Sequence, residues 1–238
     1  MNSSETWECI TMADQNNIVS VCLVKRDDVS GVPIISSLEI RPLGEHLYPT
    51  VTDNRTLTLL NRYDYGSTTG DIIRHPGDIY DRIWHVTEGK TSLKEVPAQP
   101  LSATITGNSG YDVPSVVLST AYSGDMFYGW KNNMKSPILG QQVYFHFAEV
   151  ESLADNDPRL IDIYVNDVIV EGAYRPKKLY GDTIVTPVLP VLSNYTFNLT
   201  KNSGTTEPPI LNAIEFYAVR STDSPTTFGQ EETCLPAD

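Results

Sequence analysis

Carboxylates are the most numerous side chains in this chain that could do acid–base chemistry. The sequence has 30 Asp and Glu among 238 residues, and glycoside hydrolysis needs two carboxyl groups across a cleft, one of them held protonated by its surroundings. Glu149 could take one role, with Asp71, Asp78 or Asp81 in the other. Nothing in their spacing singles out a pair. We therefore predict no catalytic residue and no enzyme, and a glycoside-active enzyme is the least favoured alternative.

The metal-binding residue types form no pattern typical of a site. The four histidines are His46, His75, His85 and His146. They show no metal-ligand spacing and accompany no nucleophile motif. The acidic stretch around Asp155 and Asp157 lacks the ligand spacing and glycine of a calcium loop. We predict no metal and no cofactor.

The three cysteines are an odd number, so at least one lacks a partner within the chain. Cys9 and Cys22 could be bridged if their segments are adjacent strands. Cys22 could equally be a buried strand residue, and the pairing of Cys234 is open as well. The sequence leaves these alternatives open.

Aromatic rings beside glycines are candidates for ligand contacts. Tyr111, Tyr128 and Trp130 lie near Gly110, Gly124 and Gly129 in predicted loops. Ring faces can cover the apolar C–H side of a sugar while carboxylates and amides take its hydroxyls. The rings with strand or helix periodicity are expected to be buried, namely Tyr80, Trp84, Phe145 and Phe147.

Charge and sequons indicate the class of partner and the compartment. A formal net charge of −13 disfavours nucleic acid and anionic lipid surfaces as partners. Four N-glycosylation sequons, at Asn2, Asn54, Asn194 and Asn198, favour secretion. The opening "NSSETWECI" is unlike a signal peptide, and no apolar run approaches the roughly 20 residues of a membrane span. We expect no direct membrane insertion by this chain.

The elements that must position these residues are mostly strands. The predicted strands are "NIVSVCLV", "PIISSLEI", "PSVVLSTAY", "QQVYFHFAEV", "RLIDIYVNDVIV", "YGDTIVTPVLPVL" and "NAIEFYAV". Such short runs separated by Gly, Pro, Asn and Asp predict an all-β antiparallel sandwich. In "QQVYFHFAEV", Val143, Phe145 and Phe147 share one face, which should be buried.

Local patterns also predict a hairpin turn, a short helix and the outer face of one strand. Asn166 and Asp167 tolerate positive φ and suit a two-residue hairpin turn. In "RHPGDIYDRIW" we expect one or two helical turns, with Asp78 as the cap and Asp81 facing the first-turn amides. In "SNYTFNLT" the i, i+4 spacing places Asn194 and Asn198 on one outer face of a strand.

The segment "PPILNAIEFYAV" resembles "VPIISSLEIRPL", 176 residues earlier, with apolar residues in step and an acid shared at Glu39 and Glu215. Together with "NRYDYGS", "IRHPGDIYDRIW", "VYFHFAEV" and "IDIYVNDVIV", these segments resemble the malectin-like ectodomains of plant receptor kinases, many of which also carry leucine-rich repeats. The resemblance covers about residues 5 to 220 and implies a jelly-roll-like sandwich with short helical turns, preceded by a partial module.

The family's ectodomain has two tandem modules, and the resemblance assigns the chain to parts of both. Residues 1–43 resemble the closing strands of a first module truncated at its start, and residues 44–58 resemble the connector. Residues 59–220 resemble a complete second module, followed by a flexible tail at 221–238. The second module is expected to fold by itself.

The resemblance also implies a ligand site. Tyr65 and Tyr122 match positions where malectin has sugar-contacting tyrosines, but Glu151 and Ser152 stand where malectin has a Tyr-Phe pair. We expect a non-enzymatic recognition module, extracellular or in a plasma-membrane ectodomain. Its partner would be cell-wall carbohydrate, or, without glycan binding, a secreted peptide or co-receptor, which the missing pair and the acid excess favour.

Overall fold

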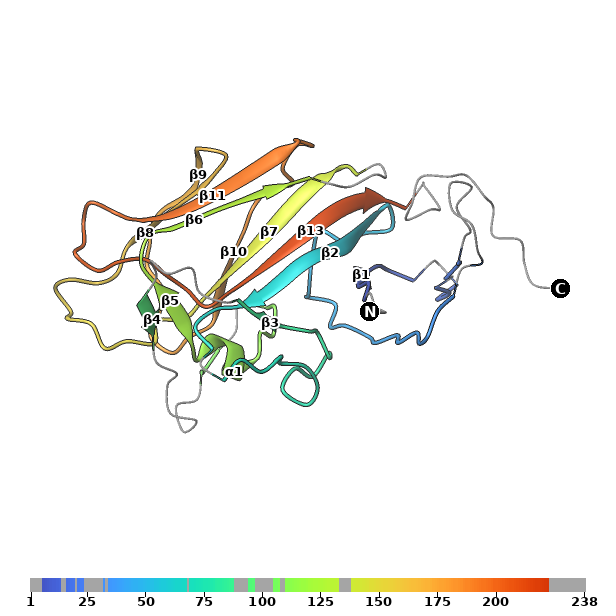
Figure 1. Cartoon of the computed structure of the whole chain (residues 1–238), viewed down its shortest axis with the longest axis horizontal. Coiled ribbons are helices and arrows are strands. Elements are labelled where there is room, and N and C mark those ends of the chain that lie inside the picture. The colour runs from blue at the N-terminus through green and yellow to red at the C-terminus, as the bar shows by residue number, and fades with distance from the viewer. Residues whose placement is uncertain are drawn as a thin grey trace.

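The structure is a computed structural model, and its regular secondary structure consists almost entirely of strands (Figure 1). It describes residues 6–13, 16–19, 21–23, 32, 34–67, 69–87, 94–96 (backbone only), 105–107, 110–132 and 138–222. Two sheets stack to form a sandwich, and a third small sheet and the helix α1 (Ser115–Leu118) lie at one end (Figure 1). The predicted all-β antiparallel sandwich is confirmed.

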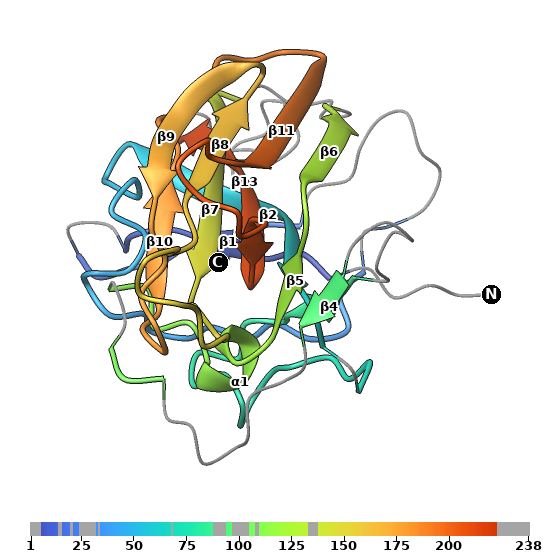
Figure 2. The ribbon, with the colours of Figure 1, turned by 90° about the vertical axis from the view of Figure 1, so that its left-hand side faces the viewer.

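The described residues form three sheets. The six-stranded sheet contains β1 (Cys9–Ile10), β2 (Arg55–Asp64), β13 (Ala213–Ser221), β7 (Gly140–Phe147) and β10 (Asp182–Val185) in that order, with β3 (His85–Val86) beside β2. The four-stranded sheet is ordered β6 (Met126–Lys131), β11 (Asn194–Lys201), β8 (Ile161–Val165) and β9 (Val168–Tyr174). The three-stranded sheet is ordered β12 (Ile210–Leu211), β5 (Ala121–Ser123) and β4 (Lys94–Val96). Figure 2 shows β9, β8, β11 and β6 of the four-stranded sheet side by side in the order of their pairing.

The first core fills the space between the two larger sheets. Val143, Phe145 and Phe147 of β7 are buried there, as the alternation in "QQVYFHFAEV" predicts. From the opposite sheet, β11 contributes Tyr195, Phe197 and Leu199. Because side chains alternate along a strand, Asn194 and Asn198 lie on the other, outer face, which confirms the predicted orientation of β11.

The other face of the six-stranded sheet is covered too. Tyr144 and Tyr217 pack there against Leu47 and Tyr48, from the segment before β2, and against Ile10 of β1. All eight residues of β7 are therefore buried. The segment before β2 supplies this second core with part of its apolar content.

The hairpin between β8 and β9 forms as predicted. Asn166 and Asp167 have φ angles of 48° and 62° and join strands whose last and first residues, Val165 and Val168, are paired. Both central residues of this two-residue turn are left-handed, the geometry that matches the twist of the flanking strands. The Asn166 side chain also accepts a hydrogen bond from the Thr196 amide at 3.0 Å.

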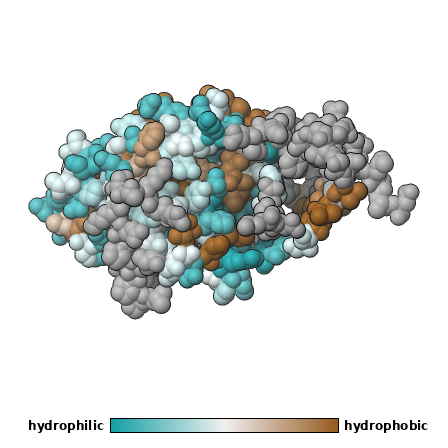
Figure 3. All heavy atoms as spheres, in the orientation of Figure 1, coloured by the Kyte–Doolittle hydropathy of each residue, from teal (hydrophilic) through white to brown (hydrophobic). Residues whose placement is uncertain are grey.

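Two predicted strands are wrong, and a third, "PSVVLSTAY", is right only for Ala121 and Tyr122, which lie in β5. The described residues of "NIVSVCLV" and "PIISSLEI" belong to no strand, and Ile34 and Ile40 are 86% and 67% exposed because no described strand pairs with that segment. Figure 3 shows apolar surface at the right-hand end, where the N-terminal segment lies. In "PSVVLSTAY" residues 115–118 form α1, because Val117 and Leu118 pack beside Trp84 in a third core, and tertiary packing overrides β propensity.

The segment "RHPGDIYDRIW" forms turns instead of the expected helix. Asp81 has a φ of 57°, which an α-helix does not accept. Asp78 does meet a backbone amide, but that of Tyr80, two residues on, at 2.8 Å. Such a side-chain turn competes with a helical turn for the same backbone group.

Neither cysteine alternative holds. Cys22 is disulfide-bonded and Cys9 is a free thiol, so the two are not bonded to each other. Cys22 is also exposed and outside any strand, so it is not a buried strand residue. Cys234 lies outside the described residues.

The predicted division into modules stays a prediction. The structure places Arg55–Thr58, the end of the expected connector 44–58, in β2, and it buries Leu47 and Tyr48. Of the expected tail 221–238, Ser221 ends β13, and residues 223–238 lie outside the described residues. Among the described residues, no helix is long and apolar enough to cross a membrane.

Candidate functional site

The structure brings Tyr65 and Tyr122 together, but inside the first core. Their rings meet edge to face with centroids 5.4 Å apart, and the side chains are only 8% and 2% exposed. The Tyr122 hydroxyl donates to the Thr87 carbonyl at 2.9 Å. Burial raises the pKa of Tyr65 above its usual value. In this conformation neither ring presents a face to a sugar.

The other three predicted rings are half-buried and lie against different cores: Tyr128 and Trp130 at the first core, and Tyr111 at the second and third. Tyr128 and Trp130 of β6 pack against the first core, where the Trp130 ring stacks on Tyr195 at 5.1 Å. Trp130 also donates from Nε1 to Gln141 Oε1 at 2.8 Å. Tyr111 packs against the second and third cores and contacts Tyr144 edge to face. The five predicted rings therefore do not form one continuous platform.

Three buried polar groups near the tyrosine pair have no hydrogen-bond partner among the residues that the structure describes. They are Asp64 Oδ2, Thr87 Oγ1 and Ser123 Oγ. Asp64 is completely buried, and its other oxygen accepts a 3.4 Å hydrogen bond from Thr120 Oγ1. Burial raises the pKa of Asp64 to about 7.

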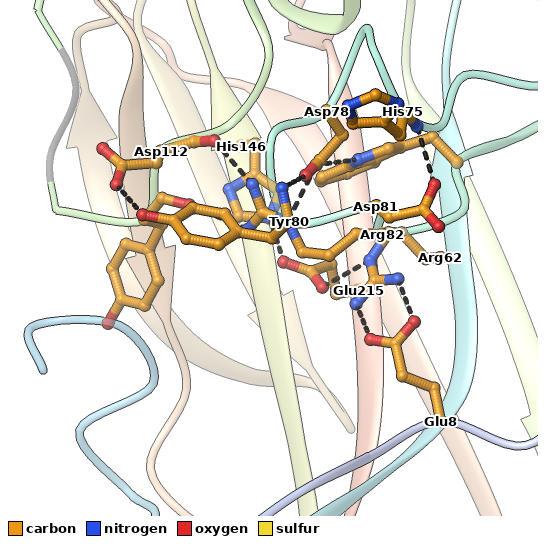
Figure 4. A network of polar contacts seen from close by, with 12 residues as sticks. Glu8, Arg62, His75, Asp78, Tyr80, Asp81, Arg82, Asp112, His146 and Glu215 are labelled. Atoms are coloured by element: carbon orange, nitrogen blue, oxygen red, sulfur yellow. Dashed lines mark hydrogen bonds and ion pairs between the residues drawn. The ribbon is translucent and has the colours of Figure 1, made fainter. Parts of the chain in front are cut away.

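A larger polar network lies on the opposite face of the six-stranded sheet (Figure 4). At its centre Glu215 of β13 is completely buried and accepts hydrogen bonds from Arg62 Nε at 2.7 Å, Tyr217 Oη at 2.6 Å and Tyr48 Oη at 2.9 Å. Burial alone would raise the pKa of Glu215. The Arg62 charge and the remaining partners outweigh burial and hold the pKa below its usual range.

The hydrogen bonds of His146 fix its tautomer. His146 Nε2 lies 3.0 Å from Glu215 Oε1, and Nδ1 lies 2.9 Å from Thr183 Oγ1. Burial lowers the pKa of His146, so the ring is neutral and carries one proton. Because the Glu215 carboxylate can only accept, that proton is on Nε2, and the Thr183 hydroxyl donates to Nδ1.

Arg62 connects this centre to the start of the chain. Its guanidinium donates to both carboxylate oxygens of Glu8 at 2.7 and 2.5 Å, in the fork geometry typical of arginine (Figure 4). Its side chain is completely buried, whereas that of Glu8 is 26% exposed. The N-terminal segment is thereby held against β2.

Arg82 connects the same centre to the loops above it. It donates to Tyr48 Oη at 3.1 Å and to Asp78 Oδ2 at 2.8 Å. It also donates to the carbonyls of Tyr111 and Asp112 at 2.8 and 2.5 Å. One buried arginine thus holds three loop segments together.

A second carboxylate fixes the turn between residues 74 and 81, here called the Asp81 turn. Asp81 accepts hydrogen bonds from the His75 amide at 2.7 Å, from Arg74 Nη2 at 2.6 Å and from Arg41 Nη2 at 2.8 Å. The hydrogen bond from Arg74 does most to hold the pKa of Asp81 below its usual range. Asp78 accepts from the Tyr80 amide within the same turn.

Three network residues have left-handed backbones. Tyr48, Asp81 and Asp112 have φ angles of 52°, 57° and 44°. Such conformations cost free energy in residues with a side chain, most of all in a bulky one such as tyrosine, and persist where the surroundings over-determine them. The network therefore holds its loops in conformations that they would not adopt alone.

The Asp81 turn presents an apolar side chain to solvent. Ile79 lies between the two anchoring carboxylates and is 71% exposed. Ile72, before the turn, and Val116 of α1 are also exposed, and Gly77 of the turn lies beside Val116. A rigid loop that displays an apolar residue loses little conformational entropy when a partner covers it.

Of the acids considered for catalysis, Asp71 is exposed, and the other three are held by arginines. Asp78 and Asp81 bind arginines as above, and Glu149 accepts from Arg159 Nε at 2.8 Å. Asp157 accepts from the Thr206 amide and from Thr205 Oγ1, both at 2.9 Å, as in an ordinary turn. In the part of the chain that the structure describes, no three His, Cys, Asp or Glu side chains are grouped so as to hold a metal ion.

The sequon asparagines that the structure describes reach the surface. Asn54 is exposed in the turn before β2, and Asn194 is exposed at the start of β11. Asn198 is partly exposed in the middle of β11. Asn2 lies outside the described residues.

Sequence reasoning missed the network around Glu215. Its members are far apart in the chain, and polar residues on strands are ordinarily exposed. The one local signal is the acid within the otherwise apolar run "NAIEFYAV". A carboxylate in such a run is stable only when it is paired or neutralised.

Comparison with known proteins places the chain in a family. The model of the malectin-like domain matches residues 1–219. The probable LRR receptor-like serine/threonine-protein kinase PAM74 of Arabidopsis thaliana is 34% identical over 228 residues, which cover 90% of this chain and 24% of that protein. The chain thus spans about a quarter of the length of this relative.

Solved structures show the same fold. A crystal structure of the plant peptide RALF23 with FER and LLG2 aligns with a TM-score of 0.59 at 20% identity, covering 77% of this chain and 53% of the matched chain. The ANXUR1 extracellular domain from Arabidopsis thaliana aligns with a TM-score of 0.57 at 13% identity, covering 69% and 49%. The chain belongs to the malectin-like domain family.

Proposed function

We propose that this chain is a non-enzymatic, extracellular recognition module of the plant receptor-kinase type, and that it binds a secreted peptide or a protein co-receptor. The observation that carries the proposal is the Asp81 turn, which displays Ile79 and is fixed by the buried Asp78–Arg82 pair and by the Asp81–Arg74 pair, whose carboxylate is buried and whose arginine is half exposed. Exposed apolar side chains on rigid supports are typical centres of protein–protein interfaces. The fold of the FER complex with a peptide and LLG2 supports the same class of partner.

The non-enzymatic part rests on the state of the acids. Hydrolysis of a glycosidic bond needs one carboxyl that is protonated near neutral pH and a second carboxylate across the cleft. Among the described residues the carboxyl whose pKa is raised is Asp64, and it is completely buried. The other candidate pairs involve carboxylates held by arginine.

Carbohydrate is the second candidate ligand. The unpaired oxygens of Asp64, Thr87 and Ser123, near Tyr65 and Tyr122, favour it because sugar hydroxyls could satisfy them. A sugar would have to displace the closed tyrosine pair to reach them. Protein or peptide binding needs no such rearrangement.

Binding measurements with the secreted chain distinguish the two candidates. The probes are synthetic RALF23, LLG2, a panel of other secreted plant peptides, and neutral glucans at millimolar concentration. We expect binding to a peptide or to LLG2 that Ile79→Asp weakens at least tenfold. The matched control, Val191→Asp, changes another exposed apolar residue and should not affect it. If the chain binds glucans and none of the proteins or peptides, carbohydrate is the ligand and the proposal of a peptide or co-receptor is wrong. If the chain hydrolyses a glycoside, the proposal of a non-enzymatic module is wrong.

A further inference from the structure

The outer face of the four-stranded sheet carries aromatic and apolar side chains in one cross-strand row. Asn198 of β11 is paired in register with Phe127 of β6 on one side and with Tyr164 of β8 on the other. Tyr164 is in turn paired with Ile169 of β9. Residues paired in register point to the same face, with Cβ atoms about 4.5–5.5 Å apart. A sequon asparagine therefore lies between two aromatic rings.

No other part of the chain that the structure describes covers this row. Phe127 is 64% exposed and Ile169 is 53% exposed. The side chains of Asn198 and Tyr164 make no hydrogen bond with any other residue that the structure describes. The Asn198 amide is thus free to carry a substituent.

We propose that Asn198 carries an N-linked glycan whose first N-acetylglucosamine units lie over Phe127 and Tyr164. The sequon Asn198-Leu199-Thr200 supplies the acceptor, and the exposed rings supply a surface for the C–H faces of the sugars. The glycan would therefore cover the row of exposed side chains, because it is attached to Asn198 at the centre of that row. This inference rests on the extracellular location in the proposed function, but not on ligand binding.

The modification is an ordinary glycosyl transfer. Nδ2 of Asn198 forms a bond to C1 of the first sugar of a lipid-pyrophosphate-linked oligosaccharide. The bond between C1 and the pyrophosphate oxygen breaks, and the lipid pyrophosphate leaves with its electron pair. The amide gives up one proton to a base of the transferase, and no oxidant or reductant is involved.

The neighbouring sequon provides a matched control. Asn194 lies on the same face of β11 but is paired with Lys131, and the next outward residue, Thr196, is paired with Gly129. A glycan on Asn194 would have no aromatic side chain of a paired strand beneath it. Only the glycan on Asn198 should be coupled energetically to Phe127.

The test uses the full chain with a cleavable secretion signal, produced in plant cells. Glycopeptide mass spectrometry should find Asn198 modified. Removal of that glycan by Asn198→Gln should lower Tm by about 2–4 °C, as expected for about 1 kcal/mol in a chain of this size. Asn194→Gln should leave Tm nearly unchanged.

The decisive comparison is the effect of Phe127→Ala with and without the Asn198 glycan. We expect a loss of about 2–4 °C in the glycosylated chain and little or no loss in the Asn198→Gln background. Phe127→Tyr, which keeps the ring, should retain the wild-type Tm. If Phe127→Ala is not secreted, Phe127→Leu serves in the same cycle.

Two results would overturn the inference. One is an Asn198 that stays unmodified in the secreted chain. The other is a Phe127 substitution that shifts Tm equally in both backgrounds. Neither result bears on peptide binding at the Asp81 turn, so the proposed function would be tested separately.

Discussion

Arg62 and Glu215 lie directly opposite each other on β2 and β13, and their side chains form a completely buried ion pair with a 2.7 Å separation between Nε and Oε2. Buried charges are costly unless pairing and hydrogen bonds compensate for lost hydration. Here Tyr217, Tyr48 and His146 complete the coordination of Glu215. The pair therefore fixes the relative positions of the sheet and of the loops that cover it.

Replacing Glu215 by Gln should destabilise the chain by about 3–5 kcal/mol, because Arg62 would keep a buried charge with only Glu8 to compensate it. Glu39→Gln is the control, since Glu39 matches Glu215 in the sequence repeat but its side chain is 54% exposed. That change should cost less than about 0.5 kcal/mol. Urea unfolding at pH 7 measures both, and equal effects would contradict the compensating role of the buried pair.

Asp64→Asn should stabilise the chain at pH 8 and have a smaller effect at pH 4. The folded pKa of Asp64 is raised to about 7, above its ordinary value, so the folded state favours the protonated form. The wild type therefore loses stability as pH rises from about 4 to about 7 while the unfolded chain ionises. The gain at pH 8 should be about 1–3 kcal/mol, the cost of one unsatisfied buried polar group. Unfolding of both proteins across this pH range checks the sign, and a gain that did not change with pH would contradict it.

Tyr122→Ala should lower the free energy of unfolding by about 3–5 kcal/mol, as expected for an aromatic side chain removed from a core. Tyr122→Phe keeps the ring, removes the hydroxyl that donates to the Thr87 carbonyl, and should cost about 1 kcal/mol. Thermal unfolding of the two variants is the measurement. A Tyr122→Ala protein as stable as the wild type would instead show that the ring is available to a ligand.

Deletion of residues 1–50 should destabilise the chain by more than about 3 kcal/mol. The deletion removes Glu8 from Arg62 and Tyr48 from Glu215, together with the apolar contacts of Leu47. The substitution Tyr48→Ala should reproduce a large part of the loss. If the shortened chain unfolds cooperatively at the same urea concentration as the full chain, residues 59–220 fold as the self-contained module that the family resemblance implies.

Local patterns predicted the parts of the fold that depend on neighbours in the chain. The turn at Asn166 and Asp167, the inward residues of β7 and the two faces of β11 all follow from turn chemistry or from the two-residue period of a strand. Each of these features is decided within about ten residues of sequence.

The remaining features depend on contacts between residues that lie far apart in the sequence. Alternation in β13 does not show that loops would cover Glu215, or that Arg62 and Arg82 would reach it from other segments. The apolar pattern of residues 33–40 predicts a strand, but a strand also needs a partner with unpaired backbone groups. Family resemblance indicates Tyr65 and Tyr122 as ligand contacts, but a resemblance between sequences does not give the exposure of a side chain.

Because β7 is buried on both faces, its amide protons should exchange with water only when the entire domain unfolds. Amide protons of residues 143–147 lie between two cores and cannot reach water through the fraying of an edge. We expect their hydrogen exchange to require global unfolding, whereas amides of β9, at the sheet edge with mostly exposed side chains, should exchange through small local openings. Deuterium uptake in β7 would therefore report the stability of the entire sandwich, and a ligand that binds only the native state should slow this uptake in proportion to the occupancy of its site.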